Sequence, residues 1–397
     1  MTLPTLAPTD ACTGCSACRA ACPRDAIAMA ADGEGFLRPN VDAAKCVGCH
    51  ACERACPVLA PGAADPAPTC FAARTRDGTL LRESSSGALF TELARPVLAA
   101  GGVVFGCVWD QGTPLTAIHA AAEDAAGLAA MRGSKYVQSD LRDTFREARA
   151  ALRAGRRVLY TGTPCQIAGL LRFLGRPDPN LLAVEIICHG VPSRAVLSRF
   201  AQTLVKGSEP PPRAFSFRDK TLGAWANPAL GWRLPDGSQA AQPFYGTDYG
   251  LAFAFAVSFR TSCFRCVAKS GASGADLTIG DLWGVSEACP RFDDGLGVSV
   301  IAAHTAVGRT VLDAIAPRLD AVSLASEVAL RGNPRYFSPV PAHRRRAWFM
   351  AHFQRGSFHA AVNYALGGPW PRRLAARAWR VARRVVARFV RTQNRGG

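Results

Sequence analysis

Eight cysteines near the N-terminus have the spacing of ligands to an inorganic cluster. Two runs of the pattern C-x2-C-x2-C-x3-C-P occupy residues 12–23 and 46–57. Thiolates three residues apart on a tight loop can bind three corners of one cubane, while the fourth cysteine of each run binds the other cluster. The spacing predicts two [4Fe–4S] clusters, one held by Cys12, Cys15, Cys18 and Cys56 and the other by Cys46, Cys49, Cys52 and Cys22.

The main alternatives for these cysteines are zinc binding and disulfide bonds. Zinc sites usually show two C-x2-C pairs rather than a triplet followed by C-P. The chain holds 15 cysteines, an odd number, and no signal peptide precedes Cys12, which argues against a secreted disulfide framework. We therefore expect iron–sulfur chemistry in a reducing, cytoplasmic environment.

A second set of cysteines lies farther along the chain, two at predicted strand ends and two in a loop. Such a set could ligate a third cluster. The alternative is a set of buried structural thiols, which is the commoner role of a lone cysteine. The candidate ligands are Cys165, Cys188, Cys263 and Cys266. The structural role is assigned to Cys70, Cys107 and Cys289.

The segment that must position these later cysteines, from Cys70 to about residue 335, has an α/β pattern. Strand-like and helix-like stretches alternate, which favours a mainly parallel sheet. Residues 207–250 are rich in Pro, Gly and aromatic side chains and are harder to interpret. The predicted strands are 103–109, 158–162, 181–190 and 276–281, and the predicted helices are 88–100, 141–154, 166–174 and 193–205.

Composition divides the chain into segments, with a boundary in the Pro-, Ala- and Gly-rich stretch 57–68. We expect a bacterial-type ferredoxin module of the α+β class over residues 1–66. An α/β domain should follow, with its first part over 67–155 and its second over 156–340. A basic helical tail is expected over 341–397.

Four glycine- or serine-rich turns stand where predicted strands and helices meet. Helix N-termini present unpaired N–H groups and partial positive charge, so such turns suit the pyrophosphate of a dinucleotide. Ser and Thr also serve as ordinary N-caps, which is the alternative for each turn taken alone. The chain has no G-x-G-x-x-G, so an ordinary Rossmann nicotinamide site is not predicted. The turns occupy residues 84–88, 132–139, 161–169 and 188–193.

Much of the net charge of +17 lies at the C-terminus, since residues 371–397 hold nine arginines and no acidic residue. On a helical projection, six of these arginines form one stripe opposite an apolar side, as in helices that lie on membranes. An anionic membrane surface, at the inner face of the membrane, is therefore a predicted partner. The alternatives are the protein's own core and an acidic redox protein, and no motif predicts nucleic acid. A second basic group is expected to add to the tail: Arg344, Arg345, Arg346, Trp348, Phe349 and Phe353.

Seven motifs occur in order along the chain: SSSG (84–87), GGVVFG (101–106), RGSKYVQS (132–139), LYTGTPCQIAGL (159–170), IICHGVPS (186–193), SCFRC (262–266) and DLTIGDLWG (276–284). In these motifs the chain resembles the beta subunit of coenzyme F-420-reducing hydrogenase and its relatives. That family includes formate dehydrogenase beta subunits and chlorophyll-cycle reductases. The resemblance extends from about residue 8 to about residue 310. One departure is the serine loop, which usually ends in Gly-Gly and here reads Gly87–Ala88.

The resemblance implies a flavoenzyme subunit that binds FAD and carries an intrinsic third [4Fe–4S] cluster, with ligands at the four later cysteines named above. Lys135 is the candidate for stabilising a reduced flavin or a phosphate, with an ordinary surface lysine as the alternative. His189 is a candidate proton donor, with a polar neighbour as the alternative. FAD contacts are implied at Ser85, Ser86, Gly87, Ser134, Lys135, Thr161, Gly162, Thr163 and Pro164.

Together these parts predict an iron–sulfur flavoprotein oxidoreductase. Clusters carry one electron at a time and a flavin exchanges two, so the pair can serve a two-electron acceptor such as a deazaflavin coenzyme or another organic substrate. A redox partner protein or a ferredoxin is the expected partner of the N-terminal clusters. The alternatives are a non-catalytic electron-relay subunit of a larger complex and a redox protein associated with cell-envelope polysaccharide synthesis.

Overall fold

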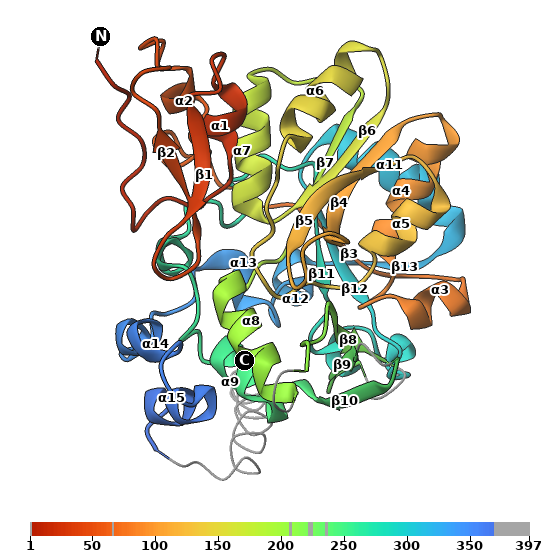
Figure 1. Cartoon of the computed structure of the whole chain (residues 1–397). Helices are drawn as coiled ribbons and strands as arrows, with labels where there is room; N and C mark the ends of the chain where they lie inside the picture. Colours follow the sequence, from red (N-terminus) through yellow and green to blue (C-terminus); the bar gives the residue numbers. More distant parts are fainter. Residues whose placement is uncertain (1, 66, 206–208, 221–224, 235–236, 369–397) are drawn as a thin grey trace, which may run out of the picture.

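The computed structural model describes residues 2–65, 67–205, 209–220, 225–234 and 237–368. Of the predicted basic tail over 341–397, residues 341–368 are described, and the arginine-rich stretch 371–397 lies outside the described residues. Two parts are evident in Figure 1, a small N-terminal module and a larger domain built on a twisted sheet. This arrangement confirms the predicted fold class, a ferredoxin-type module followed by an α/β domain.

The N-terminal module contains one antiparallel strand pair and two short helices, α1 (Ala17–Ala21) and α2 (Ala51–Arg54). Strands β1 (Ile27–Ala31) and β2 (Leu37–Val41) pair with Ile27 opposite Val41. The two cysteine loops share a backbone path, because Gly14 and Gly48 have φ values of 69° and 66° and are each followed by a second left-handed residue before the helix. The repeat in the sequence is therefore also a repeat in the structure.

The larger domain is built on an eight-stranded sheet with the order β13-β3-β12-β11-β7-β6-β4-β5. Its strands are β3 (Thr69–Thr75), β4 (Val103–Trp109), β5 (Ala117–Ala122), β6 (Val158–Gly162), β7 (Leu181–Ile186), β11 (Leu277–Asp281), β12 (Ser299–Ala303) and β13 (Leu319–Leu324). The predicted strands 103–109 and 158–162 coincide with β4 and β6.

The prediction of a mainly parallel sheet is wrong, because the sheet is mixed. The β11–β7, β7–β6 and β6–β4 pairs are parallel. The β13–β3, β3–β12, β12–β11 and β4–β5 pairs are antiparallel. Three of the antiparallel pairs involve strands that the sequence pattern did not predict at the β13 edge, and the fourth involves the unpredicted edge strand β5. The parallel strands in the middle are those whose carboxyl ends meet, and ligands of α/β folds usually bind at such ends.

Helices cover both faces of this sheet (Figure 1). On one face, α4 (Leu89–Ala99), α5 (Ala125–Met131) and α11 (Ala306–Ile315) pack their apolar sides, for example Leu93 and Leu312, against the strands. On the other face lie α6 (Thr144–Arg153) and α7 (Pro164–Leu174), with Phe145 and Leu170 in the core. Helix α7 also contacts α1, so the ferredoxin module sits against this second face.

An aromatic core joins the remaining part of the chain to the sheet domain. It lies around the antiparallel sheet of β8 (Phe215–Asp219), β9 (Ala229–Arg233) and β10 (Gln239–Pro243). Buried rings such as Phe217 and Tyr249 fill it. The helices around it are α8 (Arg194–Ala201), α9 (Asp248–Ala254), α14 (Arg346–His352) and α15 (Phe358–Ala365).

The expectation that the basic group at 344–353 adds to a membrane-binding surface is wrong for its central residues. Phe349 and Phe353 are fully buried in the aromatic core. Arg346 is buried as well and pairs with Glu34 of the ferredoxin module. These side chains hold the inner side of α14 against the fold, through apolar partners in the aromatic core and through the half-buried Glu34.

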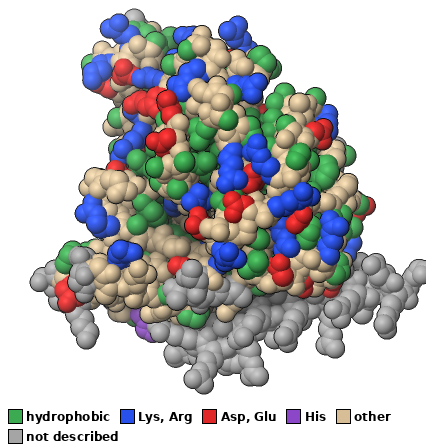
Figure 2. Space-filling model, turned by 90° about the vertical axis from the view of Figure 1, so that its right-hand side faces the viewer, with side chains coloured by type: hydrophobic (Ala, Val, Ile, Leu, Met, Phe, Trp, Pro, Cys, Tyr) green, Lys and Arg blue, Asp and Glu red, His purple; other side chains and the backbone are tan. Residues whose placement is uncertain are grey.

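Short elements complete the described chain. They are α3 (Gly78–Glu83), α10 (Val285–Ala288), α12 (Ser326–Ala329), α13 (Pro334–Phe337), and the 3-10 helices η1 (Gln202–Leu204), η2 (Phe244–Gly246), η3 (Thr261–Arg265), η4 (Pro290–Phe292) and η5 (Ala316–Arg318). Within the described ranges, no helix is both long and apolar enough to cross a membrane. Figure 2 shows basic and acidic side chains interspersed on one face of the molecule. Among the described residues, partly exposed ion pairs include Arg95–Asp77 and Arg76–Asp320.

Candidate functional site: three thiol groups and a cavity

The first group of thiols lies inside the molecule and contains the four cysteines predicted for one cluster. Cys12 and Cys15 are buried, and Cys15 and Cys18 both lie close enough to Cys12 and Cys56 for their charges to interact. Burial raises the pKa of Cys15 to about 11, and the neighbouring thiols add to the rise. Thiolates here therefore need a positively charged ligand, which fits an iron–sulfur cluster.

The second group lies at the outer end of the ferredoxin module. Its four predicted thiols line one small cavity, together with Pro23 and His50. Cys49 is exposed, and the amide of Ala26 donates a hydrogen bond to the Cys22 sulfur at 3.2 Å. Such N–H···S bonds are a usual means of tuning the potential of a cluster. The thiols of this cavity are Cys22, Cys46, Cys49 and Cys52.

The third group brings together residues that are far apart in the sequence. Cys165 lies in the first turn of α7, Cys188 follows β7, and the C-x2-C pair lies at η3. Cys188 interacts electrostatically with Cys266, and both do so with other members of the group. Burial raises the pKa of Cys263 to about 12 and also raises that of Cys165. The four predicted ligands of the third cluster thus lie together, at one wall of a cavity.

Convergence on one atom distinguishes the ligands of a single metal ion from the ligands of a cluster. In the part of the chain that the structure describes, no three His, Cys, Asp or Glu side chains converge closely enough to hold one metal ion. A structural zinc site needs such convergence, because all ligands bind the same atom. The ligands of a cubane each bind a separate iron and lie farther apart.

The first and third groups meet across Gly169 of α7. A Cβ atom at Gly169 would lie 2.9 Å from the sulfur of Cys15, so only glycine allows this close packing. Cys165, one turn earlier on the same helix, interacts electrostatically with Cys15. The N-terminal turn of α7 is fixed by a capping box between Thr163 and Gln166, with Pro164 at its first position. Helix α7 therefore positions the third group directly against the first.

A cavity of about 1200 Å³ opens beside the third group. Its volume lies above the usual range of small-molecule sites, which is about 300–1000 Å³. Every predicted FAD contact except Gly87 lines it, and so do Lys135 and His189. Polar loops form one wall, while Tyr136, Phe253 and Trp283 supply aromatic surface. A dinucleotide with a ring system and phosphates fits this combination of apolar and polar walls.

Two of the predicted phosphate-type turns contact each other at the cavity. The amide of Ser134 donates a hydrogen bond to the Ser85 hydroxyl at 2.9 Å. Ser86 donates to the carbonyl of Val298, so its hydroxyl is used by the protein. Gly87 lies behind the wall, where a Cβ would approach the Ala73 carbonyl oxygen to 2.4 Å. The close packing against β3 therefore requires a glycine at position 87.

The two predicted catalytic residues have environments that limit their roles. The Lys135 ammonium donates hydrogen bonds to the carbonyls of Ala130, Met131 and Arg132 at 3.0–3.2 Å, at the C-terminal end of α5. His189 stacks on Phe253 with ring centroids 5.5 Å apart. Burial, together with the charges of Arg335 and Lys269, lowers the pKa of His189 to about 4. Its imidazole is therefore neutral at pH 7.

Several residues at the cavity were not predicted from the sequence. Arg218 is buried and pairs with Asp281 at 2.8 Å, and the ring of Trp283 stacks on Trp225 at 5.0 Å. The Lys269 ammonium donates to the carbonyl of Cys188 at 2.8 Å. The only signal for Asp281 and Trp283 was their position in the motif DLTIGDLWG, whereas Arg218 and Trp225 come from the segment that was harder to interpret.

Two family models match parts of this chain. Residues 11–60 match the model of a 4Fe-4S dicluster domain. Residues 155–324 match the model of the C terminus of the beta subunit of coenzyme F420 hydrogenase/dehydrogenase. A chain of the F420-reducing [NiFe] hydrogenase complex from Methanosarcina barkeri is similar over 74% of this chain and 96% of that chain, with 17% identity and a TM-score of 0.46. No curated protein matches.

The fold and the two family models define an iron–sulfur protein, built from a dicluster ferredoxin module with two [4Fe–4S] clusters and a mixed α/β domain. Within that class, the chain carries the C-terminal domain of the coenzyme F420 hydrogenase/dehydrogenase beta-subunit family behind the dicluster domain. The family resemblance predicted from the seven motifs is confirmed.

Proposed function

We propose that the chain is an iron–sulfur flavoprotein oxidoreductase, which passes electrons between its clusters, FAD and a two-electron acceptor. When bound, the clusters carry single electrons and the flavin couples them to two-electron chemistry. The observation that carries the proposal is the contact of Cys15 with Gly169, because it sets the first thiol group against the third at the cavity wall. The acceptor would be a deazaflavin coenzyme or another organic substrate.

The order of the thiol groups supports a direction from the surface to the cavity. The second group includes the exposed Cys49, whereas Cys12 and Cys15 of the first group are buried between the module and α7. A ferredoxin or another redox partner protein would therefore exchange electrons at the second group. Transfer in the opposite direction uses the same sequence of sites.

The residues around the cavity would have distinct roles. Cys165, Cys188, Cys263 and Cys266 would hold the third cluster, and the loops at Ser85, Ser134 and 161–164 would face the FAD phosphates. Lys135 would stabilise an anion through its charge rather than by a direct bond, since three carbonyls already accept from its ammonium. His189, neutral at pH 7, would donate or accept a hydrogen bond at the substrate.

The main alternative is a non-catalytic relay subunit, with the reaction carried out by a partner protein. The cavity of about 1200 Å³ favours catalysis, because a pure relay needs no room for an organic substrate beside its cofactors. The other alternative is a role in cell-envelope polysaccharide synthesis at the membrane. It rests mainly on the arginine-rich stretch 371–397, which lies outside the described residues.

The test is an anaerobic assay with the full chain, reduced ferredoxin as the electron donor, and deazaflavin, nicotinamide or a dye as the acceptor. Reduction of an organic acceptor by the chain alone is the expected result. Reduction that starts only when a partner protein is added would favour the relay. Bleaching of the flavin and cluster absorption without any acceptor reduction, with or without a partner, would contradict both functions.

A further inference from the structure

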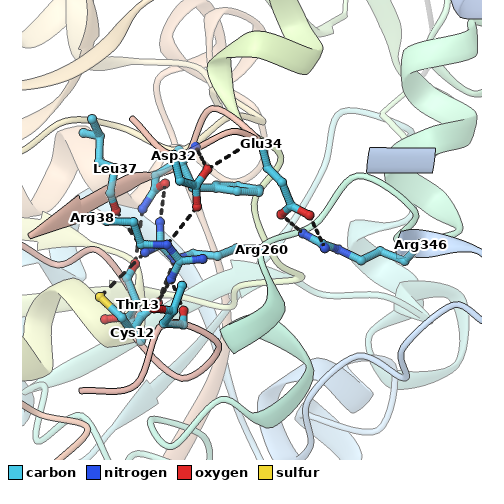
Figure 3. Close-up of polar contacts among 11 residues, drawn as sticks. Cys12, Thr13, Asp32, Glu34, Leu37, Arg38, Arg260 and Arg346 are labelled. Atoms are coloured by element: carbon cyan, nitrogen blue, oxygen red, sulfur yellow. Dashed lines mark hydrogen bonds and ion pairs between the residues drawn. The ribbon is translucent and has the colours of Figure 1, made fainter. Parts of the chain in front are cut away.

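A buried arginine lies between the first and third thiol groups. Arg260 is fully buried at the start of η3, and Figure 3 shows its guanidinium among residues of the ferredoxin module. It donates to the carbonyl oxygens of Cys12 at 2.7 Å and Leu37 at 2.9 Å, and to the Gln138 side chain at 3.0 Å. One N–H group also points at the sulfur of Cys12, at 3.7 Å.

No carboxylate neutralises this cation, in contrast to the arginines around it. Among the described residues, Arg260 has no ion pair with Asp or Glu. Arg38 pairs with Asp32 at 2.9 Å, and Arg346 pairs with Glu34 at 2.7 and 2.5 Å (Figure 3). A fully buried charge without a counter-ion is strongly unfavourable, so the counter-charge of Arg260 must come from another group.

The thiols near Arg260 belong to two different thiol groups. The Arg260 charge is repelled by Arg38, and it would be stabilised by thiolates at Cys12 of the first group and at Cys263 of the third. The backbone strengthens the second link, since the amide of Cys263 donates to the carbonyl of Arg260 at 3.0 Å. The guanidinium of Arg260 thus faces the first thiol group, while its backbone begins the loop that holds Cys263 of the third group.

The cysteine loop is shaped to admit this side chain. A Cβ atom at Gly14 would lie 2.9 Å from Nη1 of Arg260 and 2.7 Å from Nε2 of Gln138. Gly14 also has a φ of 69°, which favours glycine. The contact of Arg260 with the cysteine loop therefore depends on Gly14, which lies between the predicted ligands Cys12 and Cys15.

We propose that Arg260 is a shared counter-ion of the first and third clusters, which raises the reduction potentials of both; the inference rests on the clusters of the proposed function. Reduction adds one electron to a cluster, and a nearby positive charge stabilises the added negative charge, the more so in a low-dielectric interior. An electron that passes from the first cluster to the third, or back, therefore remains close to the Arg260 charge throughout the transfer.

The alternative is a purely structural role, in which Arg260 only ties η3 to the cysteine loop. Three variants of the full chain separate the two roles. Arg260→Gln removes the charge and keeps some hydrogen bonding, while Arg260→Lys keeps the charge. Arg346→Gln is the matched control, because Arg346 donates to the neighbouring Phe259 carbonyl but has its charge neutralised by Glu34.

The experiment is an anaerobic redox titration followed by EPR. At a fixed solution potential, Arg260→Gln should lower the ratio of reduced to oxidised first and third clusters at least tenfold, which is about 59 mV for a one-electron couple. The second cluster should change less than threefold. Arg260→Lys and Arg346→Gln should stay within threefold of the parent for all clusters.

Ratios within threefold of the parent in Arg260→Gln, with its iron content intact, would overturn the inference, and so would an equal shift in Arg346→Gln. If Arg260→Gln loses iron, the Arg260→Lys variant decides between the two roles. A ratio of reduced to oxidised cluster near that of the parent in Arg260→Lys supports the counter-ion role, and a tenfold fall in this ratio overturns it. A parent chain that lacks the third cluster would instead contradict the proposed function itself.

Discussion

Gly169 of α7 lies directly against Cys15 of the ferredoxin module, where a Cβ atom would come within 2.9 Å of the cysteine sulfur. These residues are far apart in the sequence, yet their contact sets the separation between the first and third thiol groups. Helix α7 carries Cys165 in its first turn and Gly169 one turn later, so one rigid element faces both groups. The account of electron transfer depends on this contact.

Gly169→Ala should therefore disturb the first cluster. The added methyl group overpacks the contact with Cys15, and we expect a loss of about 1–3 kcal/mol in the free energy of unfolding together with faster loss of iron. Thermal unfolding and iron release to a chelator measure the two effects. Gly78→Ala is the control, because its Cβ would meet only the Arg82 guanidinium at 3.8–3.9 Å. Similar iron release from both variants would contradict the packing argument.

Cys263→Ala should remove the third cluster only. The variant is expected to contain about four fewer irons per chain than the parent, while the two clusters of the ferredoxin module remain. Cys289→Ala serves as the control, since Cys289 is buried in a hydrophobic core and does not line the cavity. An unchanged iron content in Cys263→Ala would return this cysteine to a structural role.

Ala88→Gly should stabilise the chain. Ala88 is the N-cap of α4 and has a φ of 67°, a left-handed conformation that an alanine adopts only with strain. Glycine relieves that strain, so we expect a gain of roughly 0.5–1 kcal/mol, measured by thermal unfolding. Ala94→Gly, in the buried middle of the same helix, should have the opposite effect. A lower melting temperature for Ala88→Gly would contradict the strain argument.

His119 should make the fold sensitive to acid. Burial, together with the Lys135 charge, lowers the pKa of His119 to about 4. Below about pH 6.5 the unfolded chain binds a proton that the folded chain does not, so stability falls as the pH drops from 6.5 to 4, by about 1.4 kcal/mol per unit. Above pH 6.5 this residue has no effect.

The measurement for His119 is the melting temperature of the parent and of His119→Gln at several pH values. Glutamine can donate to the Thr161 carbonyl, as the imidazole does at 2.9 Å, but does not titrate. The parent should lose more stability than the variant between pH 6.5 and 5. Parallel pH profiles would show that His119 is protonated without cost.

The parts of the site that depend on local spacing could be predicted from the sequence. The N-terminal thiol groups, the strands β4 and β6, and the loops at Ser85, Ser134 and 161–164 that line the cavity follow from motifs of a few residues each. The mixed order of the sheet could not, because β3, β12 and β13 bring together segments from both ends of the domain. Antiparallel neighbours need no crossover helix, so the alternation of elements does not indicate them.

The long-range polar contacts were equally inaccessible to pattern analysis. Arg260 contacts Cys12 across 248 positions of the chain, and Arg346 pairs with Glu34 across 312. The basic group containing Arg346 has the composition of an exposed surface, yet Arg346 pairs with the half-buried Glu34 and the phenylalanines pack in an aromatic core. Charge and hydrophobicity along the sequence do not say which distant partner is available.

The most direct test of the central claim is the composition of the full chain purified without oxygen. Iron, acid-labile sulfide and flavin are quantified per chain, and the flavin released on denaturation is identified by chromatography. Three clusters and one dinucleotide predict about twelve irons, about twelve sulfides and one FAD. About eight irons with FMN or no flavin, after reconstitution with iron, sulfide and FAD, would contradict the account.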